Sequence, residues 1–196
     1  FRMKPDFTRK LLQWNKDSNT RSMPWKGEKD PYRIWLSEII LQQTRVEQGL
    51  AYYHKFIETF PTIQHLADAP EKEVFKCWEG LGYYTRCKNL IATAKKVAYE
   101  LNGVFPSTYD TIKELKGIGP YTAAAIASFA FNEPKAVVDG NVQRVLSRYF
   151  GISTPIDTTT GKKLYQELAQ ALIDTDQPAV YNQAIMDFGA VICKPQ

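Results

Sequence analysis

The chain has 196 residues, a formal net charge of +4 at pH 7 and 44% hydrophobic residues, which suits one compact core or two small lobes sharing a boundary. No apolar run reaches the roughly 18 to 20 residues of a membrane span, and no signal-peptide pattern opens the sequence, so we expect a soluble, intracellular protein without membrane contact. Three cysteines without paired spacing indicate free thiols in a reducing compartment rather than a disulfide framework.

Positive charge is unevenly distributed along the chain. Between residues 2 and 26, seven basic side chains face only two aspartates, and residues 86–96 carry four more basic side chains. Such clusters suit the neutralisation of phosphates in a polyanion. A solvated helix face accounts for the same charge runs, so charge alone does not decide between the two interpretations.

Apolar residues recur at helical spacing along nearly the whole chain, and period-two alternation is scarce, which predicts an all-α fold. Asp30-Pro31 is a helix-start signal, because proline at the first helical position lacks only an amide that would be unpaired there anyway. Pro61, Pro70 and Pro106 mark further starts. We expect later helices at 84–101, 121–131, 142–149, 164–172 and 179–191.

Glu38 is the first candidate for chemistry, because the helix predicted to start at Pro31 surrounds it with mostly apolar side chains. Its neighbours three and four residues away are Ile34, Trp35, Leu41 and Gln42. A carboxyl in such surroundings resists ionisation, and a carboxyl that keeps its proton near neutral pH can act as a general acid. A carboxylate on the solvent side of an amphipathic helix is the alternative.

A paired-glycine turn follows at Leu115-Lys116-Gly117-Ile118-Gly119-Pro120-Tyr121-Thr122-Ala123 and opens onto a helix of small residues. Glycines let backbone amides approach a phosphate, and the positive end of the following helix adds to the attraction. Contacts of this kind set the register on a DNA backbone without reading bases. A helix that ends in a glycine cap before another helix is the alternative for this pattern.

Asp139, in the run Val138-Asp139-Gly140-Asn141-Val142, follows a short apolar stretch and occupies the place of a helix N-cap. Capping alone accounts for the residue. A second role follows if a bond is broken at a sugar C1′, because a fixed carboxylate stabilises the positive charge that develops on the ring. A protonated Glu38 and an ionised Asp139 would then form an acid and a counter-ion.

The pattern predicts two helical lobes. Residues 25–133 form a continuous helical array that contains the glycine turn, whereas the segment after Pro134 has no obvious core of its own. We expect that segment, 134–196, to pack with the amphipathic N-terminal stretch 1–24. A groove between the lobes is the expected place for a site.

Several motifs, spread in order over nearly the whole chain, resemble those of one family. They are Met23-Pro24-Trp25, Trp35-Leu36-Ser37-Glu38-Ile39-Ile40-Leu41-Gln42-Gln43-Thr44, Gly80-Leu81-Gly82-Tyr83-Tyr84, the turn at Gly117, the run at Asp139, and Asn182-Gln183-Ala184-Ile185-Met186-Asp187. The chain is similar to the catalytic region of MutY-type adenine DNA glycosylases, which belong to the helix-hairpin-helix glycosylase superfamily together with endonuclease III. The resemblance implies a two-lobed helix-hairpin-helix fold with the active site in the cleft between the lobes.

The resemblance further implies excision of adenine mispaired with 8-oxoguanine or guanine in base excision repair, after the base is flipped out of the duplex. It assigns Glu38 to the protonation of adenine, Asp139 to the stabilisation of the sugar cation, and Asn141 to positioning. Tyr121 falls where bifunctional relatives carry a Schiff-base lysine. Because tyrosine cannot form an imine, we expect a monofunctional glycosylase.

The same resemblance assigns the residues that hold the substrate. The adenine pocket is expected to contain Arg21, Trp25, Leu41, Gln183 and Met186. One glutamine of the pair Gln42-Gln43 is expected, together with Tyr83, at the vacated stack and the opposite base. The turn on the DNA backbone is expected to contain Lys116, Gly117, Gly119, Tyr121 and Thr122. Gln183 can offer both a donor and an acceptor to an adenine edge. Core or rim packing is the alternative for Tyr83.

Cys193 corresponds to the first of four cysteines that bind a [4Fe-4S] cluster in this family, so a cluster is expected in the full-length protein. The sequence stops at Gln196, and Cys77 and Cys87 lie elsewhere in the pattern, so we expect this polypeptide not to assemble the cluster by itself. The expected partner is double-stranded DNA with an A:8-oxoG or A:G mismatch, bound by a monomer. The expected location is the cytoplasm and nucleoid of a bacterium, or the nucleus or mitochondrion of a eukaryote.

Two other functions remain open. A thymine mismatch glycosylase of the same superfamily can also place tyrosine at the position of Tyr121, although the run Gln42-Gln43-Thr44 favours the adenine branch. A non-catalytic DNA-binding module would use the glycine turn for phosphate contact alone. Base excision distinguishes the enzymes from the binding module.

Overall fold

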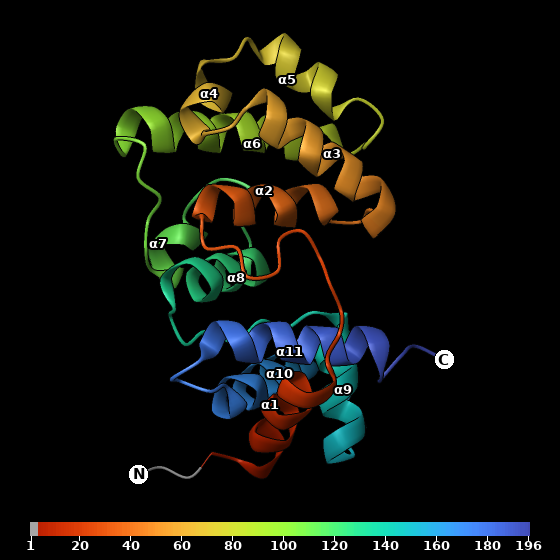
Figure 1. The fold of residues 1–196 in the computed structure, drawn as a ribbon. Helices are drawn as coiled ribbons and strands as arrows, with labels where there is room; N and C mark the ends of the chain where they lie inside the picture. The colour runs from red at the N-terminus through yellow and green to blue at the C-terminus, as the bar shows by residue number, and fades with distance from the viewer. Residues whose placement is uncertain (1–3) are drawn as a thin grey trace.

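The structure is a computed structural model that describes residues 4–196 (Figure 1). These residues form eleven α-helices and one π-helix and contain no strand, so the all-α prediction is confirmed. The helices are α1 (Asp6–Ser18), α2 (Pro31–Leu41), α3 (Val46–Thr59), α4 (Ile63–Asp68), α5 (Glu71–Trp78), α6 (Tyr84–Lys95), η1 (Lys96–Glu100), α7 (Tyr109–Lys113), α8 (Pro120–Phe131), α9 (Gly140–Phe150), α10 (Thr159–Leu172) and α11 (Pro178–Val191). None of the helices described is both long and apolar enough to cross a membrane.

Two separate hydrophobic cores hold the helices together. The first gathers buried side chains of α2 to α8 and includes Trp35 and Trp78. The second gathers buried side chains of α1, α9, α10 and α11, includes Tyr165 and Tyr181, and also takes side chains from α8. Figure 1 shows the two groups of helices one above the other, with α8 near the level where they meet. The fold is therefore two-lobed.

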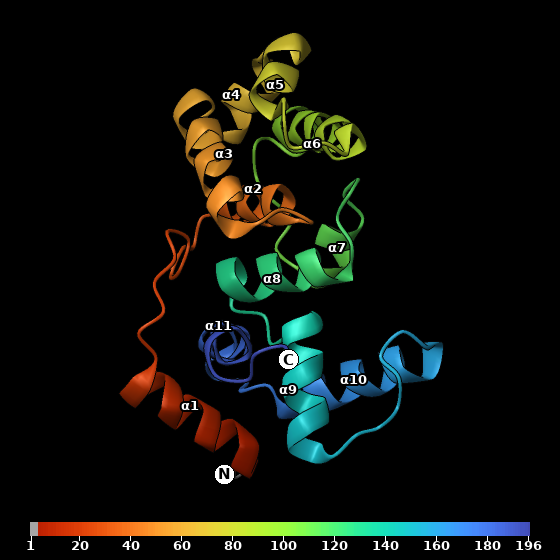
Figure 2. The same cartoon turned by 90° about the vertical axis from the view of Figure 1, so that its right-hand side faces the viewer.

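Helix α8 belongs to both cores because its side chains are small on every side. All seven residues from Thr122 to Ser128 are buried, and four of them are alanines. Ala123 and Ala127 pack into the first core, whereas Ala124 and Ala125 pack into the second. Figure 2 shows α8 between α2 on one side and α11 on the other, and α8 contacts both. A helix that is apolar all round is stable only when it is buried in this way.

Aspartates begin the two helices that carry the candidate acid and counter-ion. Asp30 Oδ1 accepts the Tyr32 amide at 3.0 Å, directly ahead of α2. Asp139 Oδ1 accepts the Val142 amide at 2.8 Å at the start of α9. Each side chain satisfies an amide that the helix itself leaves unpaired. Both helix starts predicted from the sequence are confirmed.

The helix expected at 84–101 changes type near its end. Helix α6 continues into η1, where the amide of Leu101 donates to the Lys96 carbonyl, five residues back, at 3.2 Å. The wider turn keeps Val97 and Ala98 in the first core before Gly103, at φ +76, leads the chain away. The π-helix covers so few residues that it does not alter the spacing of the apolar residues. The sequence therefore did not indicate it.

The glycine turn before α8 requires glycine at one position. Gly117 has a φ of +80, and a Cβ built there would lie 2.7 Å from the Cβ of Asn89. Gly119 has an ordinary φ of −88 and open space around it. A side chain at Gly119 would therefore fit, but it would stand beside the free amides at the start of α8.

The lobe boundaries 25–133 and 1–24 with 134–196 remain a proposal, because α8 contributes to both cores. Residues 1–3 of the second proposed lobe lie outside the described residues. In the described part of that lobe, α1 packs against α11, so the N-terminal stretch and the C-terminal segment share one core.

Enlarging a buried alanine of α8 is expected to destabilise the fold. Ala125→Leu adds bulk at a fully buried position of the second core, so the free energy of unfolding is expected to fall by about 1 to 3 kcal/mol. Ala51→Leu, at an exposed position of α3, is the matched control and is expected to change it by less than about 0.5 kcal/mol. Urea denaturation measures both variants, and an unchanged midpoint for Ala125→Leu contradicts the close packing of α8 between the cores.

Candidate active site

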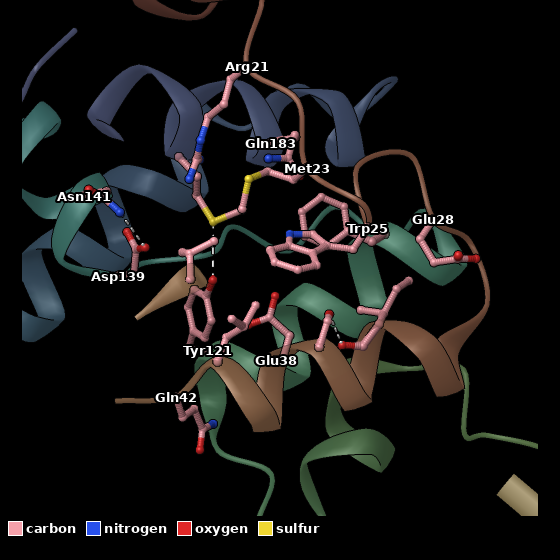
Figure 3. Close-up of a pocket in the computed structure, with 16 residues that line it drawn as sticks. Arg21, Met23, Trp25, Glu28, Glu38, Gln42, Tyr121, Asp139, Asn141 and Gln183 are labelled. Atoms are coloured by element: carbon pink, nitrogen blue, oxygen red, sulfur yellow. Dashed lines mark hydrogen bonds between the residues drawn. The ribbon is translucent and has the colours of Figure 1, made fainter. Parts of the chain in front are cut away.

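A cavity of about 340 Å³ lies between the two lobes (Figure 3). Its walls come from α2 and the loop before it, the start of α3, both ends of α8, the start of α9, and α11. Ten of the predicted site residues line it, namely Arg21, Trp25, Glu38, Leu41, Gln42, Tyr121, Asp139, Asn141, Gln183 and Met186. The volume falls within the ~300 to 1,000 Å³ of small-molecule sites, so the cavity can receive a purine base.

Glu38 projects from α2 into this cavity and is half-buried (Figure 3). Burial and, to a smaller extent, the negative charge of Asp139 raise the pKa of its carboxyl to about 7, against the opposing effect of hydrogen bonding to Tyr121. A carboxyl with a pKa near 7 holds a proton in a large fraction of molecules at neutral pH. That property is required of a general acid.

Tyr121, at the start of α8, lies between Glu38 and Asp139 in the close-up (Figure 3). Its hydroxyl donates to the sulfur of Met186 at 3.3 Å. Burial and the negative charges of the two carboxylates raise the pKa of this hydroxyl well above its ordinary value. Tyr121 is therefore a neutral hydrogen-bond donor placed between two carboxyl groups.

Asp139 is held from two sides at the start of α9. One oxygen caps the helix, and Oδ2 accepts from the Asn141 amide nitrogen at 3.3 Å. The orientation of Asn141 is itself set by Arg144, whose Nη2 donates to Asn141 Oδ1 at 2.8 Å and to the Gly189 carbonyl at 2.7 Å. A backbone amide and a side-chain amide therefore donate to the two oxygens of the carboxylate. The carboxylate is thus oriented by groups of its own lobe.

Gln43 and Tyr83 lie outside the main cavity, on a second hollow of about 400 Å³ that shares Gln42 with it. Both have left-handed backbone, with φ of +56 and +47, although neither is glycine. The guanidinium of Arg86 supports this region, because it donates to the Gln42 carbonyl at 2.6 Å and lies 5.6 Å from the Tyr83 ring centroid. Non-glycine residues in this conformation cost about 1 to 3 kcal/mol each and cluster at functional sites.

The predicted phosphate-binding turn is only partly available to a ligand. Lys116, Gly117 and Gly119 are exposed. Thr122 differs, because its side chain is buried and its hydroxyl accepts from Gln42 Nε2 at 3.2 Å. Only the amide of Thr122, in the first turn of α8, is left for a phosphate. The same bond ties Gln42 into the cavity wall, which leaves Gln43 as the exposed glutamine of the pair.

The cavity also contains six residues that sequence reasoning missed. They are Met23, Glu28, Ile34, Ser37, Val46 and Phe129. Ile34 lies one helical turn before Glu38, so helical spacing was a usable signal for it. Met23 belongs to the motif Met23-Pro24-Trp25, in which no role was assigned to it. Nothing in the sequence indicated Val46 or Phe129, which reach the cavity from α3 and from the end of α8.

The cysteines do not gather into one site within residues 4–196. Cys77 and Cys87 are buried in the first core, on α5 and α6, whereas Cys193 lies after α11 against the second core. Arg148 donates to the Cys193 sulfur at 3.3 Å. Over the same residues no three metal-binding side chains come together. The residues described fit Cys193 as one cluster ligand and do not supply four thiolates.

The chain is similar to known DNA repair proteins along most of its length. Residues 36–172 match the profile of HhH-GPD superfamily base excision DNA repair proteins. The chain is 42% identical to the adenine DNA glycosylase of Buchnera aphidicola subsp. Baizongia pistaciae over 95% of its length, and 42% identical to that of Homo sapiens over 97%. These alignments cover 53% and 36% of the two relatives, so the chain spans about half of their length or less.

Solved structures share its fold. A thermostable thymine-DNA glycosylase has a TM-score of 0.86 and 33% identity, covering 97% of this chain and 87% of that one. A trapped endonuclease III-DNA covalent intermediate has a TM-score of 0.78 and 19% identity, covering 96% of this chain and 85% of that one. At this identity the similarity concerns the fold alone. The predicted fold class is confirmed.

Removing the ionisable group of Glu38 is expected to raise stability at neutral and alkaline pH. Because the pKa of Glu38 is raised by folding from 4.5 to about 7, the folded chain binds more protons than the unfolded chain in this window, and stability falls as the pH rises through it. Glu38→Gln removes this loss of stability at high pH, because glutamine does not ionise. Its stability relative to wild type is expected to rise by up to ~3 kcal/mol between about pH 4.5 and about pH 8.

Denaturant titrations of both proteins at the two pH values measure this difference. Glu47→Gln, on an exposed position of α3, is the matched control and is expected to show no such dependence. A stability difference between Glu38→Gln and wild type that is the same at both pH values contradicts the burial of the Glu38 carboxyl.

Proposed function

The chain belongs to the HhH-GPD superfamily of base excision DNA repair proteins, and from this premise we propose that it carries the catalytic site of an adenine DNA glycosylase. The substrate is adenine mispaired with 8-oxoguanine or guanine in duplex DNA, and the bond that breaks is the N-glycosidic bond. One observation carries the proposal: Glu38, with a pKa of about 7, shares a cavity with the carboxylate of Asp139. The similarity to adenine DNA glycosylases supports adenine as the base.

Glu38 acts as the general acid. Transfer of its proton to the flipped adenine makes the base a neutral leaving group, and the resulting carboxylate then takes a proton from the water that attacks the sugar. The burial that raises the pKa of Glu38 supports this role, because an ordinary glutamate has lost its proton at neutral pH.

Asp139 stabilises the sugar during this step. Departure of the base leaves positive charge shared between C1′ and the ring oxygen, and a nearby carboxylate lowers the energy of that state. The bonds from Asp139 to the Val142 amide and to Asn141 fix the negative charge before substrate arrives. A charge that needs no reorientation during the reaction stabilises the transition state most effectively.

Tyr121 makes the enzyme monofunctional. A lysine amine in this place could form an imine with C1′ and lead to strand cleavage, whereas a phenol cannot. The raised pKa of Tyr121 keeps its hydroxyl protonated, so the side chain serves as a hydrogen-bond donor between the acid and the counter-ion.

Adenine reaches the cavity only after leaving the base stack, and a wedge fills the gap it leaves. Gln43 and Tyr83 suit this task, because both are exposed beside the cavity and Tyr83 is 66% exposed. An aromatic ring replaces the lost stacking, and an amide can hydrogen-bond the base opposite. Gln42 acts differently, as part of the cavity wall.

The glycine turn holds the DNA backbone in this proposal. The exposed Gly117 and Gly119 let the first amides of α8 approach a phosphate, and Lys116 adds a positive charge. Because such contacts are independent of base sequence, the partner is duplex DNA, and selectivity comes from the residues of the pocket and the wedge. The protein acts where the DNA of its cell lies, in the nucleoid of a bacterium or in the nucleus or mitochondrion of a eukaryote. Its action as a monomer stays a prediction, as does a [4Fe-4S] cluster with Cys193 as one ligand.

A thymine mismatch glycosylase is the second candidate. It is favoured by the thymine-DNA glycosylase structure, which is 33% identical over 97% of this chain. The adenine relatives are 42% identical, and the run Gln42-Gln43-Thr44 supports the adenine branch as well. We therefore place adenine first.

Glu38→Gln is expected to abolish excision while leaving DNA binding largely intact. Glutamine keeps the shape of the side chain but has no proton to give, so single-turnover release of adenine is expected to fall by about 10²-fold or more. Duplex affinity, measured by electrophoretic mobility shift, is expected to change little. Glu47→Gln is the control for charge and is expected to keep the wild-type rate. Unchanged excision by Glu38→Gln would reject Glu38 as the acid.

The wild-type rate is expected to fall as the pH rises above about 7, because the fraction of Glu38 that holds its proton decreases about tenfold for each further pH unit. The same single-turnover assay measures the profile. A rate that stays constant from about pH 6 to about pH 9 speaks against proton donation by a group with this pKa.

A panel of mismatched duplexes separates the two candidate functions. Strands with A opposite 8-oxoG, A opposite G and T opposite G are incubated with the protein and then cleaved with alkali at abasic sites. We expect product from the adenine-containing strands, with Glu38→Gln as the blank. Product from the thymine-containing strand alone would replace the proposed function by the second candidate.

A further inference from the structure

A third carboxylate, that of Asp187, lies behind the cavity wall and takes no part in the proposed chemistry. It is fully buried on α11. Burying an unpaired carboxylate is costly, so such a group needs hydrogen-bond donors or cations around it. Asp187 has both, and two of its partners also line the cavity.

Four partners divide between the two oxygens of Asp187. Oδ1 accepts from Arg21 Nη1 at 2.8 Å and from Gln183 Nε2 at 2.9 Å. Oδ2 accepts from Asn19 Nδ2 at 2.9 Å and pairs with the Lys26 ammonium at 3.1 Å. Burial by itself raises the pKa of Asp187, but these four contacts lower it below the ordinary value. The group is therefore ionised and only accepts hydrogen bonds.

Gln183 is the informative partner, because its amide has one acceptor oxygen and one donor nitrogen. It lies one helical turn before Asp187 on α11 and lines the cavity on the wall opposite Glu38 (Figure 3). Since the ionised carboxylate only accepts, the nitrogen of Gln183 has to face it. The oxygen is thereby left for the cavity, and the described residues give this oxygen no hydrogen-bond donor.

We propose that Asp187 is a positioning residue that fixes the hydrogen-bond polarity of the base pocket. By holding the Gln183 nitrogen, it presents an acceptor oxygen to the flipped base. An acceptor bonds to an exocyclic amine and repels a carbonyl oxygen, so the pocket selects 6-amino purines over 6-oxo purines. This inference rests on the proposed function and concerns how the same pocket chooses its base.

Loss of the carboxylate is expected to reverse this polarity. The groups that Asp187 holds, Arg21 and Lys26 among them, are donors. Without Asp187 these donors lose their shared acceptor, and we expect the Gln183 amide to turn over so that its oxygen faces them. Its nitrogen then faces the cavity, where a donor suits a carbonyl. A role limited to neutralising Arg21 and Lys26 would leave the orientation of the Gln183 amide unchanged.

The test compares adenine with hypoxanthine, which carries a carbonyl in place of the exocyclic amine, each opposite 8-oxoguanine in a duplex. In the complete protein, Asp187→Ala is expected to lower the ratio of single-turnover rates, adenine over hypoxanthine, by about tenfold or more relative to wild type. Comparing ratios cancels the difference in intrinsic lability of the two glycosidic bonds.

Two further variants make the comparison specific. Adding Gln183→Glu to Asp187→Ala returns acceptor oxygens to the pocket and a carboxylate to Arg21, so the double variant is expected to recover the ratio to within about threefold of wild type. Asp174→Ala is the matched control, because Asp174 is a buried aspartate that pairs with Lys4 away from the cavity. It is expected to keep the wild-type ratio even if stability falls.

A wild-type ratio in Asp187→Ala, or a double variant that does not recover the ratio, overturns the proposal. If Asp187→Ala does not fold, NMR of the wild type decides. The side-chain amide protons of Gln183, assigned by their loss in Gln183→Glu, are expected to exchange more slowly than those of the exposed Gln166. Equal exchange overturns the proposal. Failure of the proposed function is seen separately, as a wild-type protein that releases no adenine.

Discussion

The candidate site depends on the packing of α8 between the two cores. Small side chains let α2 approach this helix from one side and α11 from the other. Tyr121 lies in the first turn of α8, so its hydroxyl lies where the lobes meet, with Glu38 from one lobe and Asp139 from the other in the same cavity. Because protein interiors are close-packed, a bulkier helix would move the acid and the counter-ion apart.

The two carboxyl groups have different surroundings. Glu38 lies on a largely apolar helix, and burial disfavours its charge. Asp139 lies at a helix start, where a backbone amide and an asparagine amide donate hydrogen bonds to it. In the proposed function, Glu38 serves as the proton donor and Asp139 as the anion. The arrangement lowers stability at neutral pH, as is common where residues are arranged for activity.

The helices could be predicted because their ends carry local signals, such as the caps at Asp30 and Asp139. Resemblance to a family, rather than periodicity, brought Glu38 and Asp139 into one site, since no local rule pairs residues so distant in sequence. Features decided by tertiary packing escaped prediction. The hydroxyl of Thr122 turned inward to Gln42, and Phe129 entered the cavity from the far end of its helix. A buried network such as that of Asp187 appears only once the lobes are assembled.

Arg86 gives the loop with Gln43 its shape before any DNA is bound. Its guanidinium donates to the carbonyls of Ile39 and Gln42 at 2.8 and 2.6 Å and so anchors the end of α2. The unfavourable backbone of Gln43 and Tyr83 is thus already compensated in the free protein. In the proposed function, a preformed loop reaches each base pair in the same conformation and needs no refolding between one step along the duplex and the next. Differences in response then come from the bases themselves, both the extruded base and the base left opposite.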